Sequence, residues 1–407
     1  MSVLEDLKFY FFHFMPYVDL PPGFEDREKY PSMWVDFSNR FYDPVKGNQL
    51  YRRYLGEMVM AEKLGYDGVV VNEHHNTPYS MMASCTLVAA AIVPQTERVK
   101  ICAWGVPINL EFPNRLAEEY AILDVMSGGR LEVAVPLGTG MEYWANPINP
   151  ATARERMREA LDVMIQAWTA DGPTTYTGKH FNYRYLNPWP RPLQKPHPKV
   201  YMVGVGSPET IDMAAEMGFG YSIVFIPVKA QLQVFKAYRE SAAKHGHHLT
   251  SDDTPIGVFA YVAESDEQAE REYKEHIAFF FDHLIRTTPR YLAPPGYIST
   301  EQFKARAATG HDKLHGHFDW DESVKHMRIV AGTPERVANE IGRWAEEAQS
   351  SKIICHLHMG NMPRWKTIKN LTLFAEEVIP RLRGTRPALV ERMAVATNGQ
   401  ALQAGVK

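Results

Sequence analysis

Short apolar runs alternate with longer amphipathic stretches along most of the chain. Each run is five to seven residues long and rich in β-branched or aromatic residues, the pattern of a buried strand in a parallel sheet. We therefore expect a strand at each run. The runs number eight and cover residues 8–14, 68–72, 99–104, 131–136, 199–204, 221–226, 256–262 and 352–357.

The stretches between these runs repeat apolar residues every three or four positions, as one face of a helix does. Residues 48–65 carry such a stripe and end at Gly65, and residues 153–168 carry another. Residues 333–348 begin with Thr333, which suits the cap position of a helix. Strands separated by helices indicate parallel βαβ units. Eight such units favour the α/β class with a closed (β/α)8 TIM barrel over an open sheet.

Three segments exceed what a minimal barrel needs. Residues 15–47, 172–198 and 284–325 are long and rich in proline or turn residues. Loops of this length in a compact domain are usually lids or binding elements. We expect one barrel domain over residues 1–383 with these insertions, followed by a C-terminal tail over residues 384–407.

The composition excludes several classes of protein. The 407 residues are 45% hydrophobic and 12% aromatic, and 44 basic residues stand against 48 acidic ones, so the formal net charge is −4. No basic excess marks nucleic acid or an anionic membrane as the main partner. The first residues lack the features of a secretion signal, and no apolar run approaches the roughly 20 residues of a membrane span.

Only three cysteines occur, Cys85, Cys102 and Cys355, and none belongs to a CxxC pair. This spacing argues against a disulfide framework and against a zinc site. We therefore expect a cytoplasmic protein in a reducing compartment, with no bound metal.

Glu73, His74 and His75 follow directly after the expected strand at 68–72. In a (β/α)8 barrel the carboxyl ends of the strands form the face that carries the active site. A histidine at this face titrates near neutral pH and can transfer a proton. Two other interpretations stay open, namely a hydrogen-bonded histidine with a structural role and a pair of metal ligands.

A second candidate site lies where the strand at 199–204 ends and a helix begins. Gly206 leaves the backbone unobstructed, Ser207 suits the cap position, and Thr210 falls in the first turn. A helix start with free N–H groups and two hydroxyls can hold a phosphate group, although an ordinary capped helix has the same pattern. The chain contains neither GxGxxG nor GxxxxGK(S/T), so no Rossmann dinucleotide site and no P-loop is indicated.

The first strand, residues 8–14, is unusually aromatic, and alternate side chains of a barrel strand point into the barrel. Core packing explains such a run. A pocket above it would be apolar and would suit a hydrophobic substrate or a flavin ring. His356 and His358 end the last strand, where the sequence alone assigns them no role.

Five segments, taken in order, are similar to those of the luciferase-like flavin-dependent monooxygenase family. They are AEKLGYDGVVVNEHH, FPNRLAEEYAILDVMSGGRLEVAV, RPLQKPHPKVYMVGVGSPET, GTPERVANEI and LTLFAEEVIPRLR, and they span most of the chain. No single segment is decisive, but five in the family's order are hard to obtain by chance. The resemblance implies a (β/α)8 barrel that binds FMN and commonly forms a dimer.

The resemblance also implies roles for individual residues. His74 matches the family histidine that serves in proton transfer during flavin chemistry. Ser207 and Thr210 match the hydroxyl residues that hold the FMN phosphate. Cys102 and Ala103 match a pair that lies behind the isoalloxazine ring, often through a non-prolyl cis peptide, a bond that costs about 3 kcal/mol and persists mainly where function needs it.

One position departs from the family pattern. Many relatives carry a phosphate-binding arginine after the fourth strand, and Leu137 occupies that place in the cofactor site here. We expect the phosphate to lack a charge-assisted contact worth about 1.5–3 kcal/mol, or to meet another cation such as Arg184 or Arg191. Weak binding of oxidised flavin would suit an enzyme that receives reduced FMN from a partner.

The resemblance implies a two-component, FMNH2-dependent monooxygenase that acts on a small apolar organic substrate and O2 through a flavin C4a-(hydro)peroxide. A separate NAD(P)H:flavin reductase would supply the reduced cofactor, and a homodimer is expected. The insertions 15–47 and 284–325 would shield the reaction from water. Three alternatives stay open: a deazaflavin-dependent hydride-transfer oxidoreductase, a metal-dependent hydrolase and a non-catalytic flavin-binding protein.

Overall fold

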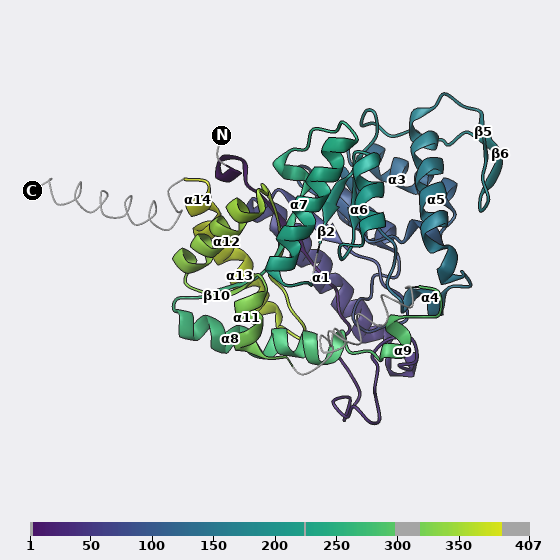
Figure 1. Cartoon of the computed structure of the whole chain (residues 1–407). Coiled ribbons are helices and arrows are strands. Elements are labelled where there is room, and N and C mark those ends of the chain that lie inside the picture. Colours follow the sequence, from purple (N-terminus) through teal and green to yellow (C-terminus); the bar gives the residue numbers. More distant parts are fainter. Residues whose placement is uncertain (1–2, 224, 298–317, 385–407) are drawn as a thin grey trace, which may run out of the picture.

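The computed structural model describes residues 3–223, 225–297 and 318–384, which fold around a parallel barrel (Figure 1). Nine parallel strands form one sheet in the order β10-β9-β11-β1-β2-β3-β4-β7-β8. An isolated parallel bridge between Ile223, directly after β8, and Ile256 of β9 closes the ring. The strands are β1 (Lys8–Phe12), β2 (Gly68–Val71), β3 (Lys100–Trp104), β4 (Leu131–Pro136), β7 (Lys199–Val203), β8 (Gly220–Ser222), β9 (Ile256–Val262), β10 (Ile329–Gly332) and β11 (Lys352–His356).

The eight expected strands are the eight strands of the closed ring, so the predicted (β/α)8 fold is confirmed. The ninth strand, β10, pairs with the second half of β9 and was not expected because its apolar run is only four residues long. A two-stranded antiparallel sheet, β5 (Thr174–Thr177) with β6 (Asn182–Leu186), lies within the insertion at 172–198. Its strands are largely exposed and polar, so they carry no buried-strand pattern.

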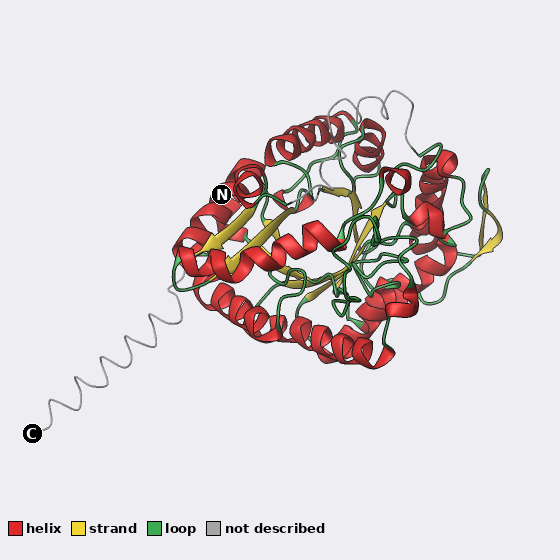
Figure 2. Cartoon of the chain, turned by 90° about the horizontal axis from the view of Figure 1, so that it is seen from below, coloured by secondary structure: helices red, strands yellow, loops and turns green. Residues whose placement is uncertain are grey.

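Helices surround the barrel on its outside, as Figure 2 shows from the end at which the strands finish. The three predicted helices are present as α1 (Pro44–Leu64), α5 (Ala153–Thr169) and α12 (Pro334–Ala348). Gly65 ends α1 with a φ of 94°, and the hydroxyl of Thr333 accepts a hydrogen bond from the N–H of Arg336 at the start of α12. The other α-helices are α2 (Cys85–Ile92), α3 (Pro113–Met126), α4 (Glu142–Ala145), α6 (Pro208–Glu216), α7 (Val228–Lys244), α8 (Asp266–Phe279), α9 (Pro289–Leu292), α11 (Trp320–His326), α13 (Arg364–Leu373) and α14 (Ile379–Leu382).

Alternate residues of β1 belong to two separate cores. Phe9 and Phe11 point outward and join the apolar layer between sheet and helices, where Phe9 meets Phe374 edge to face at 5.9 Å. Tyr10 and Phe12 point inward and join the core that fills the barrel. The aromatic first strand is therefore a packing element on both of its faces.

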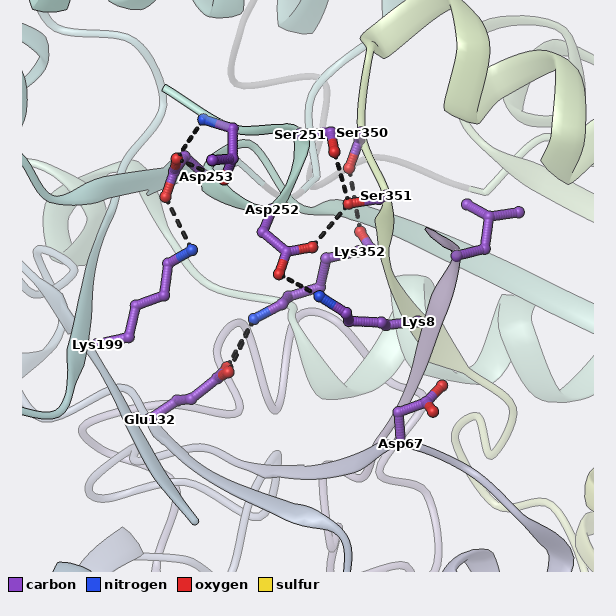
Figure 3. Close-up of polar contacts among 12 residues, drawn as sticks. Lys8, Asp67, Glu132, Lys199, Ser251, Asp252, Asp253, Ser350, Ser351 and Lys352 are labelled. Atoms are coloured by element: carbon purple, nitrogen blue, oxygen red, sulfur yellow. Dashed lines mark hydrogen bonds and ion pairs between the residues drawn. The ribbon is translucent and has the colours of Figure 1, made fainter. Parts of the chain in front are cut away.

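The barrel interior holds a buried ion pair near the end at which the strands begin (Figure 3). The ammonium of Lys352 on β11 lies 2.8 and 3.0 Å from the two carboxylate oxygens of Glu132 on β4. Tyr10 and Cys102 donate to the same carboxylate, and Lys352 also donates to the hydroxyl of Tyr201. Burial by itself would raise the pKa of the Glu132 carboxyl, but the charge and the hydrogen bond of Lys352 lower it by more. The pKa of Glu132 therefore lies below its ordinary value.

Two of the three long insertions pack against each other over the opposite end of the barrel, the mouth. The backbone N–H of Met33 donates to Arg286 O at 2.9 Å, and the indole of Trp34 donates to Leu284 O at 3.0 Å. Tyr297 donates to Gly138 O in the loop after β4 at 2.7 Å. Residues 298–317 of the third insertion and the predicted tail from 385 lie outside the described residues.

No described helix is both long and apolar enough to cross a membrane. All three cysteines are buried free thiols. The single-domain boundaries and the cytoplasmic location stay predictions.

Lys352→Met would leave the Glu132 carboxylate buried without its cation. We expect the free energy of unfolding to fall by about 3–5 kcal/mol, measured by urea titration. Adding Glu132→Leu to Lys352→Met should restore most of that loss, because no charge then remains inside the barrel. The exposed Lys236 provides the control, since Lys236→Met should change stability by less than about 0.5 kcal/mol. A loss below about 1 kcal/mol for Lys352→Met alone would show that the pair does not hold the barrel.

Candidate active site at the barrel mouth

The loop after β2 gives different tasks to three residues that are adjacent in sequence. Glu73 is buried, and its carboxylate accepts a hydrogen bond from the N–H of Cys85, the first residue of α2, at 2.9 Å. The Nε2 atom of His75 lies 3.5 Å from the other oxygen of this carboxylate. Glu73 therefore caps a helix and His75 is its partner. His74 does not take part in this contact.

His74 is held by a carboxylate from another strand loop. Its Nδ1 lies 3.0 Å from an oxygen of Glu142, which is 2% exposed. The second oxygen of Glu142 accepts the backbone N–H of Thr139 at 2.6 Å, which fixes the carboxylate on the loop after β4. A carboxylate at Nδ1 favours the tautomer with its proton on Nδ1, so Nε2 carries the free lone pair. Glu142 was not among the predicted site residues, because its only signal in the sequence is an acidic residue beside the PLGTG loop.

Two aromatic rings border the His74 imidazole. Trp34 from the insertion at 15–47 meets it at 5.3 Å and 82°, and Tyr79 meets it at 4.9 Å and 83°. Both rings are almost fully buried, whereas the His74 side chain keeps 20% of its surface exposed. The imidazole therefore lies in an apolar, partly closed environment in which a proton transfer is protected from bulk water.

Gly105 allows the loops after β2 and β3 to approach each other. A Cβ atom at this position would lie 2.7 Å from the backbone nitrogen of Glu73. Its φ of 152° is also a conformation that residues with a side chain rarely adopt. The position of the Glu73-His74-His75 loop thus depends on a glycine in the loop after the neighbouring strand.

The start of α6 offers hydroxyl donors for a phosphate group. Ser207 Oγ and Thr210 Oγ1 lie 2.7 Å apart. One hydroxyl donates its proton to the other, so the proton of the accepting hydroxyl can form a hydrogen bond to an anion. The side chain of Ser207 does not cap the helix N–H groups, in contrast to the sequence expectation for this residue. Gly206 has a φ of 97°, and a Cβ there would lie 2.5 Å from Val234 of α7.

A buried donor without a partner lies next to His74. Asn72 follows β2, is 3% exposed, and accepts a hydrogen bond from Ser80 at its side-chain oxygen. Its side-chain nitrogen has no hydrogen-bond partner among the described residues. A buried amide that lacks an acceptor fits a site for a ring with carbonyl oxygens, such as that of a flavin.

One group of residues has the composition of a metal site but not its hydrogen bonding. His13, Glu57 and His358 are buried and place one ligand atom each within 4.8 Å of one another. However, Nδ1 of His13 accepts the backbone N–H of Met15 at 2.8 Å, so its proton sits on Nε2 and points at Glu57 at 3.0 Å. A metal-bound histidine does the opposite, because it donates through the nitrogen that does not bind the ion. Arg53 also pairs with Glu57 at 2.7 Å, so this donor set does not fit a cation.

The fold and site agree with the similarity of this chain to known proteins. The family model described as luciferase-like monooxygenase matches residues 33–350. The chain belongs to the luciferase-like monooxygenase family. The alkanal monooxygenase alpha chain of Photobacterium leiognathi is 24% identical over 343 residues, which cover 82% of this chain and 94% of that protein.

Two solved structures share the fold. The oxygenating constituent of 3,6-diketocamphane monooxygenase from Pseudomonas putida, in complex with FMN, has a TM-score of 0.67 at 20% identity and covers 92% of this chain and 99% of its own. An F420-dependent secondary alcohol dehydrogenase has a TM-score of 0.63 at 19% identity, over 94% and 100% of the two chains. Membership of the luciferase-like monooxygenase family confirms the predicted family, the TIM barrel and an enzyme of the flavin-dependent monooxygenase class. It leaves the metal-dependent hydrolase and the non-catalytic flavin-binding protein without support.

The family match at Cys102 and Ala103 differs from the sequence expectation in one respect. The described cis peptide bonds all precede proline, and the bond between Cys102 and Ala103 is not among them, so the non-prolyl cis peptide expected here is absent. The Cys102 thiol donates to Glu132 at 3.3 Å and so belongs to the polar group around the Lys352–Glu132 ion pair. That the pair lies behind a flavin ring stays a prediction.

Neither arginine suggested as a substitute for the family arginine is available at Leu137. Arg191 pairs with Asp171 at 2.6 Å and donates to the carbonyl of Thr169, the last residue of α5. This end of α5 is the one farther from the mouth, because the helix runs antiparallel to the strands. Arg184 lies exposed on β6. The loop at Leu137 is instead tied to α4 by the hydroxyl of Tyr143, which donates to the Leu137 carbonyl.

The Glu73–His75 contact should make stability depend on pH. The hydrogen bond that His75 donates to the Glu73 carboxylate raises the pKa of His75 against the opposing effect of burial. Its contribution is full below the ordinary histidine pKa of about 6.5 and is lost as pH rises through the higher pKa of the folded state. His75→Asn should therefore lower the free energy of unfolding more at about pH 5.5 than at about pH 9. The same substitution at the exposed His248 is the control, and an equal loss for His75→Asn at both pH values would contradict the assignment.

Proposed function

We propose that this protein is the oxygenase of a two-component, FMNH2-dependent monooxygenase that acts on a small apolar organic substrate. The observation that carries the proposal is the contact between His74 and Glu142 at the mouth of a luciferase-like barrel. It places a basic nitrogen in an apolar environment at the end of the strands where catalytic groups of such barrels gather.

His74 handles the proton in this proposal. Because Glu142 holds the proton on Nδ1, the opposite atom, Nε2, can accept a proton from the reacting group and return it later. Bound reduced FMN would supply the electrons that activate O2. Glu142 stabilises the imidazolium while it exists, and Trp34 limits the access of water. General acid–base groups of this kind contribute about 10²–10⁴-fold to a rate.

The cofactor would lie across one half of the mouth. Ser207 after Gly206 and Thr210 in the first turn of α6 would hold the phosphate, while Cys102 and Ala103 would lie behind the ring. Leu137 would contact the cofactor without supplying a charge. The missing guanidinium fits a protein that binds its flavin only for one turnover and receives it reduced.

A separate NAD(P)H:flavin reductase would deliver the reduced cofactor. The solved relative that contains FMN is described as an oxygenating constituent, which is the part of such a system that this chain would form. A homodimer in the cytoplasm completes the proposal.

A second candidate is a hydride-transfer oxidoreductase that uses the deazaflavin coenzyme F420. It is favoured by the fold shared with the F420-dependent secondary alcohol dehydrogenase. The two candidates differ in the cofactor bound, so the affinities for FMNH2 and for reduced F420, measured anaerobically, separate them. A preference of at least tenfold for F420 would favour hydride transfer.

Turnover should depend on His74 and not on its neighbour. With FMNH2 from a flavin reductase, O2 and a panel of apolar aldehydes, ketones and terpenes, we expect a product that contains one atom of labelled oxygen. His74→Gln should reduce its rate of formation by about 10²–10⁴-fold, because the proton acceptor is lost. His75→Gln is the matched control and should retain the rate within about threefold, since His75 pairs with Glu73. Equal losses in the two variants would remove His74 from the mechanism.

The phosphate site can be tested without turnover. The double variant Ser207→Ala, Thr210→Val removes both hydroxyls and should weaken the binding of FMN by about tenfold to a hundredfold, since a hydrogen bond to a charged group is lost. Riboflavin has no phosphate, so its affinity should be the same in the variant and the parent. Both constants follow from fluorescence titration. An equal loss for FMN and riboflavin would place the phosphate elsewhere.

A further inference from the structure

The barrel mouth divides into two chemically different halves. The residues assigned to the cofactor lie on β3 or follow β4 and β7, and His74 follows β2; these four strands are consecutive in the ring. The other four strands, β8, β9, β11 and β1, are also consecutive and contribute aromatic rings at the same end. Within this second half, β11 stands four places from β4 in either direction around the ring of eight, so the two strands lie opposite each other.

His356, the last residue of β11, lies at the centre of the aromatic half. Its imidazole is nearly parallel to Phe259 at 4.6 Å and 17°, and to Phe14 at 5.3 Å and 14°. Phe12 lies 4.7 Å away, and Phe225 lies 6.4 Å away. Phe225 has a φ of 59°, a strained conformation for a residue of its size, and such strain is concentrated at functional sites.

The imidazole of His356 has polar atoms that nothing in its surroundings uses. The side chain is 1% exposed, and neither Nδ1 nor Nε2 has a hydrogen-bond partner among the described residues. Burial lowers its pKa to about 3, so the ring is neutral and offers one N–H donor and one lone pair. A buried donor without an acceptor destabilises a folded protein, and at the mouth of the barrel such a donor fits a position where a ligand supplies the acceptor.

We infer that His356 donates a hydrogen bond to the oxygen atom of the substrate, and that the substrate is a carbonyl compound with an otherwise apolar skeleton. The inference rests on the proposed function and names its substrate class. The phenylalanine rings would contact the hydrocarbon part, and the single N–H would fix the position of the oxygen. His356 is thus a positioning and specificity residue rather than a proton carrier.

The two imidazoles of the mouth border the same group of rings. His74 contacts Tyr79 at 4.9 Å, Tyr79 contacts Phe14 at 5.3 Å, and Phe14 contacts His356 at 5.3 Å. Two aromatic residues therefore separate the group that would move a proton from the group that would hold the substrate oxygen. A carbonyl compound held at His356 would extend towards the cofactor half past Phe14 and Tyr79.

The histidine two residues later provides a matched comparison. His358 is equally buried, and both of its ring nitrogens also lack partners among the described residues. It stacks on His13 at 4.4 Å and 22° and meets Tyr54 of α1 at 5.4 Å, so it lies between the barrel and the helices and not in the aromatic half. A general effect of losing a buried imidazole would thus be seen equally at both positions.

Binding of two pairs of compounds without flavin tests the inference. Decanal is compared with decane, and camphor with camphane, because the members of each pair share a skeleton and differ in the carbonyl group. Calorimetry with the parent should show about a tenfold preference for the carbonyl member of at least one pair. His356→Phe should abolish the preference without lowering the melting temperature, since it removes unpaired polar atoms. His356→Gln keeps a donor and should keep part of the preference, and His358→Gln should keep all of it.

Three results would overturn the inference. They are a parent protein without a carbonyl preference in either pair, a preference retained in His356→Phe, and an equal loss of preference in His358→Gln. Because no flavin is present, these outcomes are independent of the turnover and FMN-binding experiments, which decide the proposed function by themselves.

Discussion

The ion pair between Lys352 and Glu132 is the constraint on which the barrel depends. It joins β11 to β4, two strands on opposite sides of the ring, through a carboxylate that also accepts hydrogen bonds from Tyr10 and Cys102. Two charges are stable inside an apolar core only while they remain paired, so any rearrangement that separates these strands exposes a large desolvation cost. Figure 3 shows further polar contacts at this end, including those of Lys8 with Asp252 and Lys199 with Asp253.

The polar groups that stabilise the barrel lie near the end at which the strands begin, so the mouth is available for other groups. From Glu132 towards the mouth, the barrel interior is aromatic. Trp104 stacks on Tyr201 at 5.4 Å, and the phenylalanine rings around His356 lie nearer to the mouth. The polar side chains of Asn72, His74 and Glu142 follow the ends of β2 and β4. The charged pair thus lies near the start of the strands, and aromatic rings separate it from the mouth. This order separates the residues that stabilise the barrel from those that can react, as is usual for the fold.

The insertions complete the site rather than decorate it. Trp34 and the backbone around Arg286 lie on segments far apart in sequence, and their mutual hydrogen bonds form the cover beside His74. Gly140 lies so close to Leu292 of α9 that an added Cβ would be 2.1 Å from the Leu292 carbonyl oxygen, so the loop that carries Glu142 packs against the same cover. A carboxylate positioned in this way is protected from water, which strengthens its interaction with the imidazole.

The sequence by itself determined the barrel and the end of it at which the candidate site lies. Apolar β-branched runs bounded by glycine and proline mark the eight strands, and chain direction alone places His74 at the carboxyl end of β2. Only the tertiary structure decided which groups work together. Glu142, which contacts His74, is 68 residues away from it in sequence. The Cys102 thiol donates to the carboxylate of Glu132, which is 30 residues away, and the cis peptide expected at Cys102 is absent. The physical reason is that local patterns report burial and backbone conformation, whereas hydrogen-bond partners are fixed by the register and closure of the strands around the ring.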